Sequence, residues 1–514
     1  MSIYARGLVF LACLSGCDRD AVYETSIDPG APVATTGALH FAVAGPNELL
    51  SYDVSRDALN RRPLTDRPVL WSATPDGRAL VVVTEDGLMT HIVTGEGGAA
   101  GRARTYALED AFESVSFSND GRYAVFHFAA AAPRRGVSGT RASESVDGLF
   151  VRNPNALAIV DLEEEAGPTN PTRRTLKAFG SGPTAVVVTD ETELDGRPIR
   201  LAYAFAERYV VVFDVGQPEA VERVVHLTLA DDARSVLPLE VVPLQVEGRP
   251  SALVRASATD NIFLLTFGAA DSGVPRPELN ALPGGIGLRA LLPVSTSSGL
   301  RIVTANVDHL GVVDPQTGSR RVAPVSTTVS EMIPFEGADG RAAALLWSPG
   351  SSGVGYVDLD SLSTRLGQAI TPQLLPVGID QLHPVAGLAQ AVAVARSTLI
   401  VLDFESQSAT PFQIGGTNSS FRLEDVYVDA LTLTVFARVA GSPGGIVSIA
   451  LETGVTTSVT LHDVSQLFFL SEGRDLAALH EDAFGRVSRL PAASLGRAKP
   501  TSRGGLYFSE IFDR

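Results

Sequence analysis

The chain of 514 residues has a formal net charge of −17, from 58 acidic and 41 basic residues. This charge argues against nucleic acid and against anionic lipid as partners held by electrostatic attraction. The two cysteines are Cys13 and Cys17, both close to the N-terminus. The rest of the chain therefore has no disulfide available and needs a core of its own, which a chain of this length can bury.

Residues 1–16 have the form of an export signal, in which Arg6 precedes a short apolar run that ends at Leu14. The run is too short to span a bilayer, which requires about 20 apolar residues. Leu14-Ser15-Gly16-Cys17 resembles the lipobox of bacterial lipoproteins. This resemblance implies lipidation of Cys17 and a lipid anchor in the inner or outer membrane of the bacterial cell envelope, with the domain outside the cytoplasm. The alternatives are a plain secretory signal and Cys13 as the acceptor.

Residues 17–36 are expected to comprise the lipidated cysteine and a flexible tether, because they are polar and contain Pro and Gly. From residue 37 a pattern recurs, with an apolar strand, a tight turn, a second apolar strand, an apolar–Asp–apolar segment and a polar strand. Asp-Gly between apolar runs is a strong hairpin signal because the turn needs positive φ. The clearest turns are Thr74-Pro75-Asp76-Gly77-Arg78, Ser118-Asn119-Asp120-Gly121-Arg122, Ala338-Asp339-Gly340-Arg341 and Ser471-Glu472-Gly473-Arg474.

The apolar–Asp–apolar segments recur roughly every 40–55 residues where no unit is missed, which is the period of a repeat protein. Their aspartates are Asp53, Asp161, Asp214, Asp314, Asp358 and Asp403, and Ile449-Ala450-Leu451-Glu452 is a degenerate copy. Four short strands in each unit predict an all-β fold, a β-propeller of four-stranded blades that occupies residues 37–514. We count about ten units, or about eight to ten blades, where about four to eight blades are usual.

These turns and segments resemble the YVTN and TolB-type (WD40-like) β-propeller repeats, whose signature combines "SPDGR" with a later "vvD…tG". The resemblance implies the architecture and says little about function. A count above the usual range leaves three interpretations open, namely a large ring, units that share a blade, or two misplaced boundaries. The alternative architecture is a β-solenoid or an array of sandwiches.

Two stretches interrupt the period. Residues 129–155 form a long insertion within the third unit and carry Arg134, Arg135 and Arg141, a candidate contact for a partner. Residues 190–198 are expected to form an acidic hairpin tip. In both cases the alternative is a solvated loop without a function.

The acidic tip imitates the start of a calcium-binding loop through Glu191, Glu193 and Asp195. Ala202 stands where the closing Glu is needed, so no metal is expected there. Gly285-Ile286-Gly287-Leu288-Arg289-Ala290 imitates a dinucleotide-binding fingerprint. It lacks the surrounding βαβ unit and is expected to connect two blades.

No catalytic residue, metal ligand or cofactor site emerges from the other motifs. The chain has no nucleophile elbow and no phosphate-binding loop, and the eight histidines are isolated, which favours structural roles. The recurring aspartates are expected to bond backbone amides of the following turns.

These observations favour a membrane-anchored envelope lipoprotein whose propeller is a non-catalytic, protein-binding scaffold. One alternative is a propeller hydrolase or lactonase acting on a small envelope substrate, which would need convergent polar side chains at the channel. The other is a sensor of a ligand or carbohydrate, which would need clustered surface aromatics.

Overall fold

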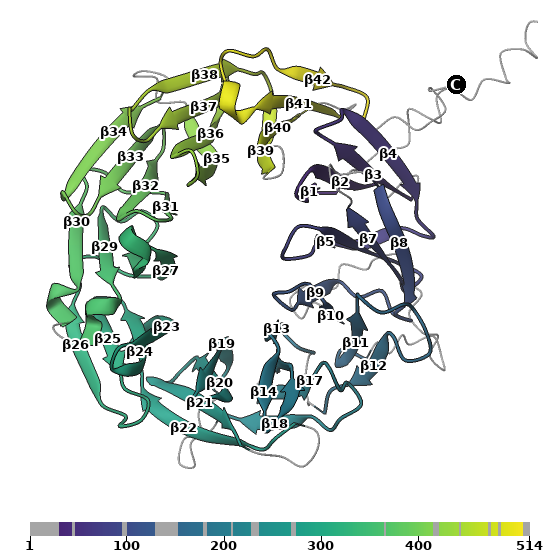
Figure 1. The fold of residues 1–514 in the computed structure, drawn as a ribbon, viewed down its shortest axis with the longest axis vertical. Helices are drawn as coiled ribbons and strands as arrows, with labels where there is room; N and C mark the ends of the chain where they lie inside the picture. Colours follow the sequence, from purple (N-terminus) through teal and green to yellow (C-terminus); the bar gives the residue numbers. More distant parts are fainter. Residues whose placement is uncertain are drawn as a thin grey trace, which may run out of the picture.

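The computed structural model is a ring of small β-sheets (Figure 1). It describes residues 30–43, 47–94, 100–128, 153–177, 182–206, 209–227, 236–268, 274–363, 366–414, 421–441, 444–470, 474–481 and 485–506. Within these ranges the strands form ten four-stranded antiparallel sheets, which are the blades of a β-propeller. The predicted fold class is confirmed, and of the three interpretations of the unit count the large ring is correct.

The first five blades follow the chain in order, with one inserted hairpin in blade 4. Blade 1 contains β1 (Val33–Ala34), β2 (Ala38–Val43), β3 (Glu48–Asp53) and β4 (Ala58–Pro63). Blade 2 contains β5 (Pro68–Ala73), β6 (Ala79–Thr84), β7 (Leu88–Thr94) and β8 (Ala100–Ala107). Blade 3 contains β9 (Ser114–Phe117), β10 (Tyr123–His127), β11 (Ala156–Asp161) and β12 (Thr172–Thr175). Blade 4 contains β13 (Ala185–Val188), β16 (Leu201–Phe205), β17 (Tyr209–Asp214) and β18 (Arg223–His226), with the inserted strands β14 (Thr192–Leu194) and β15 (Arg197–Ile199). Blade 5 contains β19 (Pro238–Val246), β20 (Arg249–Ala256), β21 (Asn261–Phe267) and β22 (Pro277–Pro283).

The other blades repeat this order, and short 3₁₀ segments occur in their turns. Blade 6 contains β23 (Leu288–Thr296), β24 (Gly299–Asn306), β25 (His309–Val313) and β26 (Arg320–Pro324). Blade 7 contains β27 (Glu331–Glu336), β28 (Ala342–Trp347), β29 (Gly353–Asp358) and β30 (Ile370–Leu374), with η2 (Ala338–Gly340), η3 (Asp360–Ser363) and η4 (Leu366–Gln368). Blade 8 contains β31 (Gln381–Val385), β32 (Gln390–Ala395), β33 (Thr398–Asp403) and β34 (Ser408–Gln413). Blade 9 contains β35 (Arg422–Asp429), β36 (Thr434–Ala440), β37 (Gly445–Ala450) and β38 (Thr456–Thr460). Blade 10 contains β39 (Val464–Leu470), β40 (Asp475–His480), β41 (Arg486–Pro491) and β42 (Thr501–Arg503), with η5 (Ala492–Ser494).

Each blade has its first strand toward the centre of the ring and its fourth strand at the periphery (Figure 1). Because neighbouring strands are antiparallel, the turns between strands one and two and between three and four lie on one face of the ring. We call this the turn face. The turns between strands two and three and the connections between blades lie on the other face, the connection face.

The predicted hairpin turns have the expected chemistry at two of the four positions quoted. In blade 2, Asp76 accepts hydrogen bonds from the Thr74 hydroxyl, 2.6 Å away, and from the Arg78 amide, 3.0 Å away. Gly77 has φ +66°, which an L side chain rarely adopts. Ser118, Asp120 and Gly121 repeat the arrangement in blade 3. Residues 338–340 instead form the short segment η2, and residues 471–473 lie outside the described residues.

The core lies between blades, because both faces of each sheet pack on a neighbour. Every residue of the second strands β2, β6, β16 and β40 is buried, without the alternation of a half-exposed sheet. Tyr203 of blade 4, for example, shares a cluster with Phe263 and Phe267 of blade 5. The continuous apolar runs of the sequence thus reflect burial on two sides.

Blade 10 closes the ring against blade 1 without exchanging a strand, since each of these sheets consists of consecutive strands. Leu39, Phe41 and Tyr52 of blade 1 pack with Leu470 and Leu479 of blade 10 and with other apolar side chains. Arginines at the periphery add bonds to backbone carbonyls, such as Arg489 Nη1 to Ser55 O at 2.8 Å. Side-chain packing and these polar contacts therefore hold the seam.

The observed start of the propeller lies slightly before residue 37, since β1 occupies Val33–Ala34 within the expected tether. A strand of two residues has no hydrophobic run from which to predict it. Among the described residues, no helix is long and apolar enough to cross a membrane.

Candidate functional site

The recurring aspartates at the ends of third strands bind the backbone of the following turn, as predicted. Asp53 accepts from the Arg56 amide at 3.0 Å, Asp214 from Gly216 at 2.9 Å and Asp403 from Ser406 at 2.8 Å. Asp161, Asp314 and Asp358 make the equivalent bonds to Glu163, Gln316 and Asp360. These carboxylates are hydrogen-bonded within turns that are distributed around the ring, so they do not converge on one site.

The acidic stretch 190–198 forms the predicted hairpin, made of β14 and β15 on the turn face. Asp195 and Gly196 occupy its tip with φ +51° and +77°. Leu194 and Ile199 belong to the core shared by blades 4 and 5. The Asn119 side chain of blade 3 donates to the Asp190 carboxylate at 3.1 Å. The hairpin thus contacts its own blade 4 and both neighbours, blades 3 and 5.

Arg200, directly after the hairpin, links blades 3 and 4. Its guanidinium is 2.7 Å from the Asp120 carboxylate, 3.8 Å from that of Glu191 and stacked on the Tyr123 ring. Burial alone would raise the pKa of Asp120, but hydrogen bonds from Ser118 and Arg200 hold that pKa below its usual value. The Glu191 carboxylate is therefore engaged in an ion pair, as part of a blade junction.

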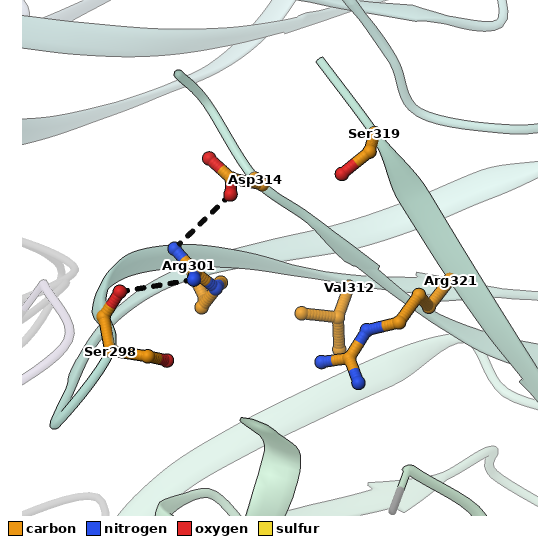
Figure 2. Close-up of a pocket in the computed structure, with 6 residues that line it drawn as sticks. All are labelled: Ser298, Arg301, Val312, Asp314, Ser319 and Arg321. Atoms are coloured by element: carbon orange, nitrogen blue, oxygen red, sulfur yellow. Dashed lines mark hydrogen bonds and ion pairs between the residues drawn. The ribbon is translucent and has the colours of Figure 1, made fainter. Parts of the chain in front are cut away.

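A pocket of about 210 Å³ opens in blade 6, among β24, β25 and β26 near the turn face (Figure 2). It is lined by Ser298, Arg301, Val312, Asp314, Ser319 and Arg321. Arg301 lies 3.6 Å from Asp314 and donates to the Ser298 carbonyl at 3.0 Å. Figure 2 shows the Arg321 guanidinium beside Val312, apart from the Arg301–Asp314 pair. The Arg321 guanidinium donates to the Leu362 carbonyl at 2.8 Å.

The charges of this pocket suit a small anion or a zwitterion. Arg301 is balanced by Asp314, whose pKa is lowered, despite some desolvation, by the amides of Gln316 and Thr317 and by Arg301. Arg321 brings a second positive charge, and the serines bring hydroxyl groups that donate or accept. This pocket could not be recognised in the sequence, because its residues come from three strands and two turns and form no motif.

The inner strands bring no catalytic constellation together in the part of the chain that the structure describes. No group of three or more His, Cys, Asp or Glu side chains there has a metal-binding arrangement. On β35, Glu424 and Asp425 both pair with Arg438. These carboxylates serve as partners of one buried arginine.

Two of the buried histidines illustrate the predicted hydrogen-bonded structural role. His40 in blade 1 lies 2.9 Å from the Thr35 hydroxyl and 2.8 Å from that of Ser51, and burial lowers its pKa to about 4. His480 in blade 10 contacts the Ser488 hydroxyl at 2.7 Å. A buried imidazole with such a depressed pKa is neutral at physiological pH.

The stretch from Gly284 to Gly287 is the predicted connection between blades, joining β22 to β23 on the connection face. Gly285 has φ +90°, and a Cβ there would lie 2.3 Å from the Arg320 guanidinium. Arg320 in turn donates to Asn306 at 3.0 Å. Gly285 therefore allows close packing against an arginine, a role that the sequence does not reveal.

The predicted lipidation site Cys17 and the candidate contact residues Arg134, Arg135 and Arg141 lie outside the described residues. The described ends of the insertion are Phe128 and Asn153, which follow β10 and precede β11. This confirms that the insertion interrupts the third unit between its second and third strands, and it therefore leaves from the connection face.

No family model and no curated protein sequence matches the chain. Among solved structures, a dihydro-heme d1 dehydrogenase NirN is similar with a TM-score of 0.42 and 12% identity, over 86% of this chain and 77% of that one. A eukaryotic initiation factor has a TM-score of 0.41 and 9% identity, over 84% and 96% of the two chains. Porphyromonas gingivalis dipeptidyl peptidase 4 has a TM-score of 0.43 and 12% identity, over 82% of this chain and 58% of that one.

Proposed function

We propose that this protein is a lipid-anchored component of the bacterial cell envelope whose propeller is a non-catalytic scaffold for a protein partner. The scaffold role is supported by the structural contacts that the charged side chains make. The recurring aspartates bond the backbone of turns, and the buried Arg200 and Arg438 bond across blade junctions, so these charges support the frame of the ring and not a reaction site. Rigid frames that present loops are a common basis for recognition.

The lipid anchor is supported by Leu14-Ser15-Gly16-Cys17 after a short apolar run. Replacing Cys17 by Ser is expected to move the protein from the membrane fraction to the soluble fraction and to abolish incorporation of labelled palmitate. Cys13→Ser is the matched control and leaves both properties unchanged. Palmitate incorporation that persists in Cys17→Ser would contradict the anchor.

The partner contact is proposed at the insertion in blade 3, with Arg134, Arg135 and Arg141 as its basic residues. The test is a cross-linking pull-down of the full-length protein from its native envelope, beside a version that lacks residues 130–152. We expect a stoichiometric partner with the first and its loss with the second. Shortening the hairpin at Asp195 and Gly196 on the opposite face serves as a control. Recovery of no partner with the full-length protein would contradict the scaffold.

A second candidate is a ligand sensor, which the pocket of blade 6 favours. Its two arginines and two serines suit a small carboxylate or phosphate. Calorimetric titration with a panel of amino acids and inorganic phosphate, against Arg321→Gln, tests this role. No comparable observation supports the hydrolase or lactonase alternative.

A further inference from the structure

The inner strand of each described sheet is paired on one side only, and its other edge faces the centre of the ring (Figure 1). Unpaired N–H and C=O groups on such an edge can pair with another extended chain, and proteins normally block them. The blades differ in how these edges are blocked, and the differences follow the order of blades around the ring.

Four consecutive blades carry a proline at the same level of the inner strand. In blade 7, Pro334 pairs with Ala344, which pairs with Val357, the residue before the recurring Asp358. The prolines at this level in blades 5, 6 and 8 are Pro243, Pro293 and Pro384, opposite Ala252, Ile302 and Ala391. Proline has no N–H and is tolerated on an edge strand. These edges have therefore lost a donor at the middle of the strand.

Blades 9, 10 and 1 are blocked in other ways. The β35 edge carries Glu424 and Asp425 in a bulge, both held by Arg438. The next edge is capped by blade 9, because the Leu467 amide of β39 donates to Asp425 at 2.9 Å and its carbonyl accepts from the Tyr427 hydroxyl at 2.7 Å. In blade 1 the inner strand has only two residues.

The edges of blades 2, 3 and 4 have no proline at that level, where Ala73, Phe117 and Val188 stand. The β5 edge begins with Pro68 and bulges at Val69, whereas the pairing of β9 and of β13 is regular. The backbone amide directly after each of these strands donates to a carbonyl of the same sheet. The bonds are Thr74 N–H to Ala79 O at 2.9 Å, Ser118 N–H to Tyr123 O at 3.0 Å and Thr189 N–H to Leu201 O at 2.8 Å. In an antiparallel ladder, the backbone groups of successive residues point alternately toward the paired strand and away from it. The N–H and C=O groups of Ala73, Phe117 and Val188 therefore point away from the paired strand.

These three strands are also neutral and accessible. Pro68–Ala73, Ser114–Phe117 and Ala185–Val188 contain no charged residue. Every side chain of β9 and most of those of β5 are half-buried, so solvent reaches this part of the inner rim. We call β5, β9 and β13 the open arc.

We propose that the open arc binds an extended, neutral segment of a partner protein by strand addition. This inference rests on the proposed scaffold function and specifies its binding mode. The segment adds to a single edge, that of β9, whose backbone donors and acceptors match the spacing of an extended polypeptide. The half-buried Val115 and Phe117 of β9 favour apolar side chains at alternate positions of the segment.

The test uses two variants that place a proline on the β9 edge, Val115→Pro and Phe117→Pro, the second at the level of the natural prolines. Val428→Pro at that level of blade 9 is the matched control. Dodecapeptides are selected from a random phage-displayed library on the full-length protein, and the tightest is synthesised. We expect either arc variant to weaken its binding by about tenfold or more, and the control to leave it unchanged.

A second measurement does not depend on the folding of the variants. The selected peptide is N-methylated at alternate residues in its two possible phases, and we expect one phase to abolish binding and the other to preserve it. Failure to select any peptide, or equal tolerance of both phases, would overturn the inference. A native partner recovered equally by wild type and by both arc variants would overturn it as well while leaving the scaffold function intact.

Discussion

The ring contains two kinds of blade junction, the seam between blades 10 and 1 and the continuous junction between blades 3 and 4. At the seam no chain connection crosses, and Phe41 and its apolar neighbours pack across it. At the other junction the chain is continuous, Phe213 belongs to a cluster shared by the two blades, and Arg200 adds an ion pair with Asp120. This propeller therefore closes without a shared strand, with apolar packing across the seam as at an internal junction.

The largest effect is expected from removing a fully buried aromatic at the seam. Phe41→Ala should lower the free energy of unfolding by about 3–5 kcal/mol, the usual cost of such a cavity. Phe213→Ala, equally buried between blades 3 and 4, is the matched control with a similar cost. Limited proteolysis should cleave blades 1 and 10 first in Phe41→Ala only. Identical fragments from both variants would show that the seam is not the first junction to open.

Acidification is expected to weaken blade 1 through His40. Its folded pKa is about 4, against about 6.5 when unfolded, so the unfolded chain binds the proton first. Stability therefore falls as the pH drops from about 6.5 to about 4, by about 3 kcal/mol for this group. Urea unfolding at several pH values should show a shallower dependence in His40→Asn. His91, also near pKa 4, contributes equally to both curves, so their difference isolates His40.

A smaller effect is expected at the continuous junction. Arg200→Gln removes an almost fully buried guanidinium from Asp120 and Tyr123, and should cost about 1–2 kcal/mol, because the chain still joins the blades. Thermal unfolding measures the loss, with the exposed Arg78→Gln as a control. A cost equal to that of Phe41→Ala would mean that polar contacts dominate this junction.

The smallest effect is expected from the exposed polar contacts of the seam. Arg503 lies 3.8 Å from the Asp57 carboxylate, and both side chains are well exposed. Such pairs contribute about 0–1 kcal/mol, so Arg503→Gln should shift the urea midpoint very little. A loss comparable to that of Arg200→Gln would assign the seam a polar clamp in place of apolar packing.

The architecture could be predicted from the sequence because its signals are local. Asp-Gly turns and the aspartates at the ends of six third strands bond within a few residues, so their chemistry can be recognised along the chain. The junction contacts could not be predicted in this way. Arg200 and Asp120 are far apart in sequence, and so are Gly285 and Arg320, which come together only in the folded ring.

The prolines of the inner strands are intermediate between the turns, which could be predicted, and the junction contacts, which could not. Pro243, Pro293, Pro334 and Pro384 are visible in the sequence, and their common meaning requires the register of each strand. Without that register a proline in an apolar run only weakens the prediction of a strand. With it, the same residue marks a blocked edge.

Closure without an exchanged strand also bears on how such a ring changes in evolution. No sheet borrows a strand from another blade, so a duplicated or deleted unit of four strands leaves all other ladders intact. Only the angle between neighbours must adjust, and apolar side chains of similar size accommodate such adjustments. The architecture thereby permits a change of blade number by whole units, and new termini can be opened at a connection between blades without cutting a sheet.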